Sequence, residues 1–196
     1  MNRFFIIRHG ETEWNKKGIC QGIINNHLDE KGFEDAYKIA YKLKETGIKF
    51  DVFIATPLVR TIETMSIIKY ILNDTSPINI NKGIIERNFG GLEGQDVDLV
   101  TKEIEKKTYN DNKGFESDDV LIERIKNAYN KINSEYENKN ILIVSHSHAI
   151  PALLSSIVPN KYSFFTKYPN LNTCLIENKD NKFEVKELYF LNIENN

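Results

Sequence analysis

The chain has 196 residues, a hydrophobic fraction of 40%, a charged fraction of 28% and a formal net charge of -2. This length fits one well-filled core better than two, so we expect a single domain over residues 1–196. The near-neutral charge argues against a nucleic-acid partner, and no apolar run approaches the ~18 residues that span a bilayer. The N-terminal apolar run is too short for a secretory leader and Cys20 and Cys174 have no paired spacing, which indicates a reducing, cytoplasmic setting.

The first predicted elements are a strand and a long helix. Residues 4–7 form a short continuous apolar run, which is typical of a buried strand. Residues 29–46 carry apolar side chains at steps of three and four, so we expect a helix there, capped by Asp29 and ended by Gly47. Its predicted buried face comprises Phe33, Ala36, Tyr37, Ala40 and Leu43.

A second strand and helix follow directly. Residues 51–56 predict another buried strand, and the next helix should run over residues 57–72. Thr56 stands before Pro57, the order expected for a capping hydroxyl ahead of a proline at the first helical position. Thr56 is therefore expected to cap this helix.

The second half of the chain continues the alternation. Residues 102–119 are charged and rich in asparagine, and predict a short helix and an exposed loop. Further helices are expected over residues 120–132 and 149–157, and strands at 78–85, 140–148, 173–177 and 183–190. This order predicts an α/β fold, a three-layer α/β/α sandwich with a mostly parallel central sheet.

Cationic and imidazole side chains recur where the predicted strands end. Arg8 and His9 follow the first strand, Arg60 lies just after the second, and His146 and His148 close the strand at 140–148. Ligands of parallel sheets bind beyond the carboxyl ends of the strands. Gathering cations and imidazoles in a partly dehydrated cleft is unfavourable unless an anion lies between them, and a phosphate group meets that need.

Neither a metal nor a nucleotide cofactor is expected. The chain has no Gly-x-x-x-x-Gly-Lys loop for a nucleoside triphosphate. His146 and His148 stand two residues apart on a predicted strand, and we expect no metal ion shared between them. We interpret His27 and His148 as structural or surface histidines.

Four stretches resemble, in order, the signatures of one family. "FIIRHGETEWN" is similar to the segment of the histidine phosphatase superfamily, also called the phosphoglycerate mutase-like family, in which Arg-His-Gly follows the first strand. The stretch "ATPLVRTIETMSII" resembles the family's segment with a phosphate-binding arginine. "IIERNFGGLEG" resembles its acid-bearing segment, and "ILIVSHSHAIPALL" its strand with the second histidine. The match spans residues 3–177 and implies the phosphoglycerate mutase-like fold, within the phosphatase branch of the family.

The resemblance implies a role for each matched residue. His9 corresponds to the nucleophile that takes the phosphoryl group, and Glu86 to the general acid that protonates the leaving oxygen and then activates water. A carboxylate beside a phosphate anion should have a raised pKa. The groups that hold the phosphoryl oxygens correspond to Arg8, Arg60, Asn15 and His146, and the substrate-binding stretches add Gln21, Gly22 and Ser147.

Some positions depart from the family pattern. Ser147 stands where glycine is usual after the second histidine, which puts the phosphate contact of that backbone amide in question. Asn25 replaces a common aspartate and His27 a common proline in a loop that helps to enclose the substrate, so specificity is expected to differ.

We expect a metal-independent hydrolase of a small phosphomonoester that acts through a phosphohistidine on His9. Mutases of the family carry a longer insertion after the acid-bearing stretch, whereas only the polar span 95–119 occupies that place here. Phosphoglycerate mutase-type transfer remains the alternative chemistry, and a non-catalytic phosphate-binding or interaction module the alternative class. The expected partner is a small phosphorylated substrate, and the sequence leaves the oligomeric state open.

Overall fold

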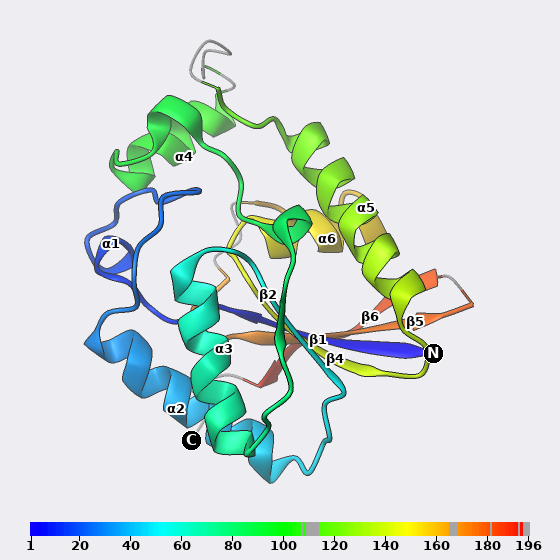
Figure 1. Ribbon diagram of the computed structural model, residues 1–196. Helices are drawn as coiled ribbons and strands as arrows, with labels where there is room; N and C mark the ends of the chain where they lie inside the picture. Colours follow the sequence, from blue (N-terminus) through cyan, green and yellow to red (C-terminus); the bar gives the residue numbers. More distant parts are fainter. Residues whose placement is uncertain (107, 109–113, 165–167, 181, 192, 194–196) are drawn as a thin grey trace.

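A six-stranded sheet forms the centre of the molecule, with the strand order β3-β2-β4-β1-β5-β6 (Figure 1). The computed structural model describes residues 1–106, 108, 114–164, 168–180, 182–191 and 193. The strands are β1 (Asn2–Arg8), β2 (Val52–Ala55), β3 (Ile78–Ile80), β4 (Asn140–Ser145), β5 (Thr173–Lys179) and β6 (Lys182–Leu191). Strands β1 to β4 run parallel, and β5 and β6 add an antiparallel edge, which confirms the mostly parallel sheet.

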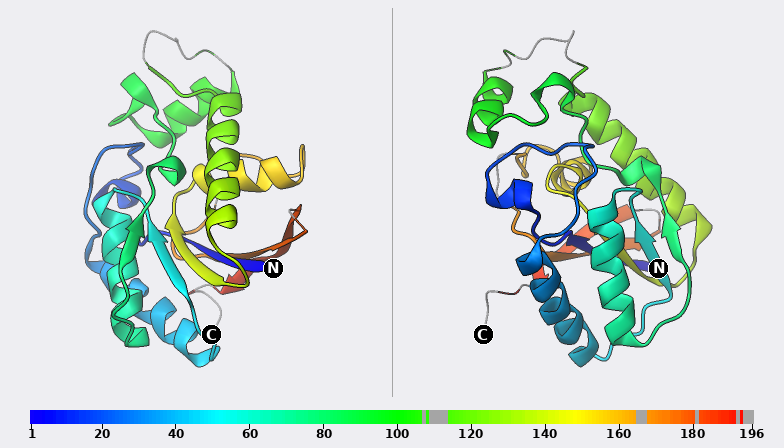
Figure 2. Two further views of the ribbon diagram at one scale, coloured as in Figure 1. Left: turned by 45° about the vertical axis from the view of Figure 1, so that its right-hand side comes forward. Right: turned by 60° about the vertical axis from the view of Figure 1, so that its left-hand side comes forward.

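Helices cover both faces of this sheet. The helices α2 (Glu30–Glu45) and α3 (Val59–Leu72) lie on one face, and α5 (Asp118–Glu135) and α6 (Ala149–Ile157) on the other (Figure 2, left). Alternate side chains of β1 enter the two cores, Phe5 and Ile7 toward α2 and α3, Phe4 and Ile6 toward α5 and α6. The expected three-layer sandwich is therefore confirmed.

A smaller layer lies beyond the sheet, where α4 (Val97–Glu105) sits near the short helix α1 (Glu13–Lys16) (Figure 1). It has its own apolar cluster, formed by Cys20, Phe89, Leu92, Val100 and Ile104. The helix begins before the expected span 102–119, and the loop expected there lies partly outside the described residues. The expected strand at 78–85 is shorter, because 3-10 helices at Lys82–Ile84 and Gly90–Leu92 follow β3. Over the described ranges, no helix is long and apolar enough to cross a membrane.

The buried face of α2 differs from the prediction. Asp29 caps the helix as expected, its Oδ1 accepting the N–H of Gly32 at 2.7 Å. Phe33 and Tyr37, however, are 39% and 41% exposed. The stripe that faces the sheet is rotated away from these aromatic residues and comprises Gly32, Asp35, Ala36, Ile39, Ala40 and Leu43.

The capping role expected for Thr56 is wrong. Helix α3 begins at Val59, after an N-cap residue, Leu58, that makes no side-chain capping bond. The N–H of Val59 instead donates to Oδ1 of Asn25 at 2.7 Å, from a loop far away in sequence. The Thr56 hydroxyl accepts the N–H of Leu58 at 3.3 Å, lies 2.9 Å from the Thr61 hydroxyl, and lies 3.0 Å from Nε2 of His146.

Candidate active site

Strand register brings the two central histidines together. In the parallel pair of β1 and β4, Arg8 stands opposite Ser145, and the N–H of His9 donates to the Ser145 carbonyl at 3.0 Å. His9 directly follows β1, and His146 directly follows β4. The centroids of their rings lie 5.3 Å apart. Adjacent parallel strands that end at the same level thus place residues from opposite ends of the sequence side by side.

The expectation that His146 and His148 both lie on the strand at 140–148 is wrong. Strand β4 ends at Ser145, and His148 is already the N-cap residue of α6. Its ring lines the pocket and lies 5.0 Å from the ring of Phe89, between centroids. Burial outweighs the nearby Glu86 carboxylate and lowers the pKa of His148 to about 4. His148 therefore contributes a neutral imidazole to the pocket wall, which the sequence interpretation missed.

The glycine after His9 has a packing reason. A Cβ atom on Gly10 would lie 2.8 Å from the carbonyl oxygen of Gly32, near the start of α2. The backbone N–H of Gly10 also donates to Oγ1 of Thr64 on α3, at 3.1 Å. Only glycine allows this close approach, which fixes the chain at His9 against the α2 and α3 layer.

The hydrogen bonds of His9 define one tautomer of a neutral ring. Nδ1 lies 2.7 Å from the carbonyl oxygen of Gly10, and Nε2 lies 3.3 Å from Nε of Arg60. A carbonyl only accepts and a guanidinium only donates, so the proton is on Nδ1 and the lone pair on Nε2. Burial, with the charges of Arg60 and Arg8, holds the pKa of His9 well below its usual value. An unprotonated Nε2 beside two cations can attack phosphorus.

Arg60 joins His9 to the loop that precedes α2. Besides its contact with His9, its Nη1 and Nη2 each donate at 2.8 Å to the carbonyl oxygens of Ile24 and Gly22. Burial is the main cause that lowers the Arg60 pKa to about 10, so the group stays charged at neutral pH. The same cause lowers the pKa of Arg8 to about 10. Both guanidiniums line the pocket and supply the positive charge that an anion needs.

His146 lies behind His9 and does not line the pocket. It is fully buried, and burial together with the charge of Arg60 holds its pKa well below the usual range. Its Nε2 contacts the Thr56 hydroxyl, whereas Nδ1 has no hydrogen-bond partner among the described residues. Nδ1 is thus a buried polar atom for which the described residues supply no partner, on a ring next to that of His9.

Glu86 lies at the start of α6. Its Oε1 accepts the N–H groups of Arg87, His148 and Ala149 at 2.9, 3.1 and 3.2 Å, and its Oε2 accepts the Ser147 hydroxyl at 3.0 Å. Burial raises the pKa of Glu86, but the neighbouring His148, these backbone donors and Arg60 outweigh it, and the pKa is lowered. The raised pKa was expected for Glu86 beside a bound phosphate. In the protein without a bound anion, the pKa of Glu86 is lowered instead.

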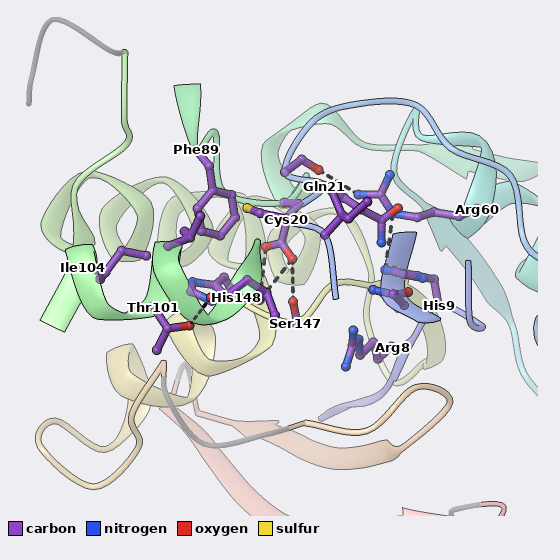
Figure 3. A pocket seen from close by; sticks show the side chains of 16 residues that line it. Arg8, His9, Cys20, Gln21, Arg60, Phe89, Thr101, Ile104, Ser147 and His148 are labelled. Atoms are coloured by element: carbon purple, nitrogen blue, oxygen red, sulfur yellow. Dashed lines mark hydrogen bonds between the residues drawn. The ribbon is translucent and has the colours of Figure 1, made fainter. Parts of the chain in front are cut away.

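The remaining predicted residues line one pocket of about 110 Å³. They are Asn15, Gln21, Gly22 and Ser147. Figure 3 shows Arg8, His9 and Arg60 on one side of it and Phe89, Thr101 and Ile104 on the other. Cys20 lies between them, and burial raises the pKa of its thiol to about 12. Within the described part of the chain, no group of three or more His, Cys, Asp and Glu side chains is placed to hold a metal ion.

Sequence reasoning missed the wall of the pocket that α4 provides. Its residues are Val97, Val100, Thr101 and Ile104. Their three- and four-residue spacing was a readable signal for a helix with one apolar face. That this face closes the pocket depends on contacts of α4 with residues 18–20, through the N–H of Val97 to the Gly18 carbonyl at 2.8 Å and the N–H of Cys20 to the Gln95 carbonyl at 2.9 Å.

Comparisons with known proteins identify relatives of this chain. A family model described as histidine phosphatase superfamily (branch 1) matches residues 4–190. The chain is 31% identical over 190 residues to the uncharacterised phosphatase PhoE of Bacillus subtilis, covering 95% of this chain and 94% of that protein. It is 32% identical over 157 residues to a broad-specificity phosphatase of Saccharomyces cerevisiae, covering 78% of this chain and 68% of the relative.

A solved structure supports the fold. The phosphoglycerate mutase of Bacillus anthracis superposes with a TM-score of 0.85 at 24% identity, over 94% of this chain and 91% of that one. The family match includes every residue placed in the pocket, and so the chain belongs to branch 1 of the histidine phosphatase superfamily.

Proposed function

We propose that the protein is a metal-independent phosphatase that hydrolyses a small phosphomonoester through a phosphohistidine on His9. The observation that carries this proposal is the neutral His9 ring, with Nδ1 bonded to the Gly10 carbonyl and the Nε2 lone pair next to Arg60. An uncharged imidazole buried among cations is suited to receive a phosphoryl group. Arg8, Arg60, Asn15 and the unpartnered Nδ1 of His146 are proposed to hold the phosphoryl oxygens.

In the first step, the Nε2 lone pair attacks phosphorus and the ester P–O bond breaks. The leaving oxygen takes a proton from Glu86, whose pKa rises when the phosphate dianion binds beside it. In the second step, water attacks phosphorus and gives a proton to the Glu86 carboxylate. The P–N bond breaks, its electron pair returns to Nε2, and inorganic phosphate leaves.

Hydrolysis of p-nitrophenyl phosphate in the presence of EDTA tests the activity. We expect the unaltered protein to release phosphate and His9→Ala to lose the activity. His27→Ala is the matched control: His27 was expected in a loop that encloses the substrate, but in the structure it is exposed and lines neither the pocket nor the larger space beyond it. Rapid quenching with radiolabelled ester should trap an acid-labile, alkali-stable adduct on His9.

Other outcomes separate the remaining functions. Steady interconversion of 3- and 2-phosphoglycerate would indicate mutase transfer, the activity for which the structurally similar Bacillus anthracis protein is named. Binding of phosphate without turnover of any monoester would indicate a phosphate-binding module. A labelled adduct on a residue other than His9 would overturn the mechanism.

The substrate is proposed to be a small molecule in the cytoplasm. The pocket volume of about 110 Å³ suits a phosphoryl group and a few further atoms. Cys20 and Cys174 are free thiols, in keeping with a reducing compartment.

A further inference from the structure

The pocket has two chemically unlike sides. Arg8, His9 and Arg60 form the side where phosphate is proposed to bind (Figure 3). Apart from the hydroxyl of Thr101, the opposite side is built of apolar side chains from the loop after α1, the segment after Glu86, and α4 (Figure 3). These are Ile19, Phe89, Val97, Val100 and Ile104. Once a phosphoryl group occupies the cationic side, the ester oxygen and its alcohol extend toward this apolar side.

The apolar wall continues outward into a larger space. A vestibule of about 500 Å³ shares Ile19, Val97 and Ile104 with the inner pocket. It adds Phe164, Tyr168 and Pro169 from the chain before β5. The ring of Phe164 lies over the pocket residue His148 with an interplanar angle of 20° and 5.5 Å between centroids. The continuous wall offers an apolar alcohol burial from one end of the site to the other.

Charge in the vestibule disfavours a second anion on the substrate. Two carboxylates, of Glu11 and Asp98, line it, against the one guanidinium of Arg8 that borders it from the phosphate side. Among the described residues that line either space, the arginine and lysine side chains are Arg8 and Arg60, at the phosphate end. A carboxylate or second phosphate on the alcohol would lose hydration against apolar groups and face like charge.

We propose that the substrate is the monophosphate of an apolar alcohol, alkyl or aryl, that carries no anionic group besides its phosphate. This inference rests on the proposed phosphatase activity and deepens it. Esters with an added carboxylate or phosphate are rejected by the α4 wall and the vestibule carboxylates. Up to the length that the vestibule can hold, a longer apolar chain gives a higher kcat/KM for the ester.

Two esters of equal intrinsic reactivity test this preference. Hexyl phosphate and 6-phosphonooxyhexanoate differ only at the far end of the alcohol, so their P–O bonds break with nearly equal ease. We expect kcat/KM for hexyl phosphate to exceed that for the carboxylate ester by about tenfold or more, the factor that 1.4 kcal/mol gives. From ethyl to butyl to hexyl phosphate, kcat/KM should rise by up to roughly fourfold per methylene.

A matched pair of variants on α4 assigns the preference to its wall. Val97 is 43% exposed and lines both spaces, whereas Leu99 is 57% exposed on the same helix and lines neither. Val97→Lys should shift the ratio of the two esters by about tenfold toward the carboxylate ester, the factor that 1.4 kcal/mol gives. Leu99→Lys, with the same added charge, should leave the ratio unchanged.

The outcomes distinguish the inference from the function on which it rests. Equal or better hydrolysis of the carboxylate ester by the unaltered protein, with His9→Ala inactive, overturns the inference and leaves the phosphatase standing. An equal shift of the ratio by Val97→Lys and Leu99→Lys also overturns it. Absence of phosphate release from every ester overturns the proposed function and the inference with it.

Discussion

The Ser147 hydroxyl donates to Oε2 of Glu86 across 3.0 Å, at the point where α6 begins. Ser147 stands where the family usually has glycine, and this difference put the phosphate contact of the backbone amide in question. In the structure its side chain acts on the acid instead, because it adds a donor to the backbone N–H groups that already hold the carboxylate. Each donor favours the ionised form of Glu86.

Ser147→Ala should raise the pKa of Glu86, because it removes a hydrogen bond to the carboxylate but leaves the backbone donors in place. The limb of kcat/KM against pH that reports Glu86 should then move to higher pH. Ser147→Thr keeps a hydroxyl and should retain the original profile. Identical pH profiles for the three proteins would show that the hydroxyl does not act on Glu86.

Arg60→Lys should reduce kcat/KM by about 10²- to 10³-fold, the loss typical of removing one preorganised donor from a charged transition state. Lysine keeps the charge but cannot contact His9 and the carbonyls of Gly22 and Ile24 together. Steady-state hydrolysis of p-nitrophenyl phosphate measures the loss. Activity within a few fold of the unaltered protein would contradict the contacts assigned to Arg60.

Stability should fall as the pH drops below about 6.5, the pKa of an unperturbed histidine. His9, His146 and His148 have lowered pKa values when folded, so in this range the unfolded chain binds protons that the folded protein does not. Each histidine then removes up to about 1.4 kcal/mol of unfolding free energy per pH unit. Urea unfolding at pH 7.5, 6.5 and 5.5 measures this slope.

His146→Gln should lessen the slope, because one of the three imidazoles with a lowered pKa is removed. The comparison uses slopes, so a general loss of stability in the variant does not affect it. A free energy of unfolding that is the same at pH 7.5 and 5.5 for the unaltered protein would contradict the neutral state of these three rings in the folded protein.

Asn25→Ala should lower the free energy of unfolding by about 1 kcal/mol, the usual effect of losing a helix cap. Oδ1 of Asn25 accepts the first N–H of α3, and the N-cap residue Leu58 cannot replace it. Asn25→Asp keeps an acceptor oxygen and adds a charge that suits a helix N-terminus, so it should retain stability. Chemical denaturation of both variants checks the expectation, which equal losses in the two would refute.

The central strands and helices were predictable because burial leaves a local record in the sequence. The apolar runs at 4–7 and 140–145 lie in β1 and β4, where both faces of the sheet are covered. The grouping of Arg8, His9 and Arg60 also followed from local information, since parallel strands end at one edge. The resemblance supplied Glu86, which periodicity alone would leave as a surface carboxylate.

Features that depend on distant partners were not predictable in the same way. The cap of α3 comes from Asn25, in a loop that precedes α2, and the apolar wall of the pocket needs α4 to pair with the chain near Gly18. The low pKa of Glu86 needs the start of α6, which no pattern around residue 86 encodes. In each case the deciding contact joins segments whose approach only the folded chain specifies.

The thiol of Cys20, a residue that lines the same pocket as His9, stays protonated because burial raises its pKa to about 12. Oxidants and alkylating agents react with the thiolate, so they find little reactive sulfur there at neutral pH. A phosphatase that uses imidazole for catalysis and keeps its neighbouring sulfur inert should go on working under peroxide, a condition that silences enzymes with a cysteine nucleophile.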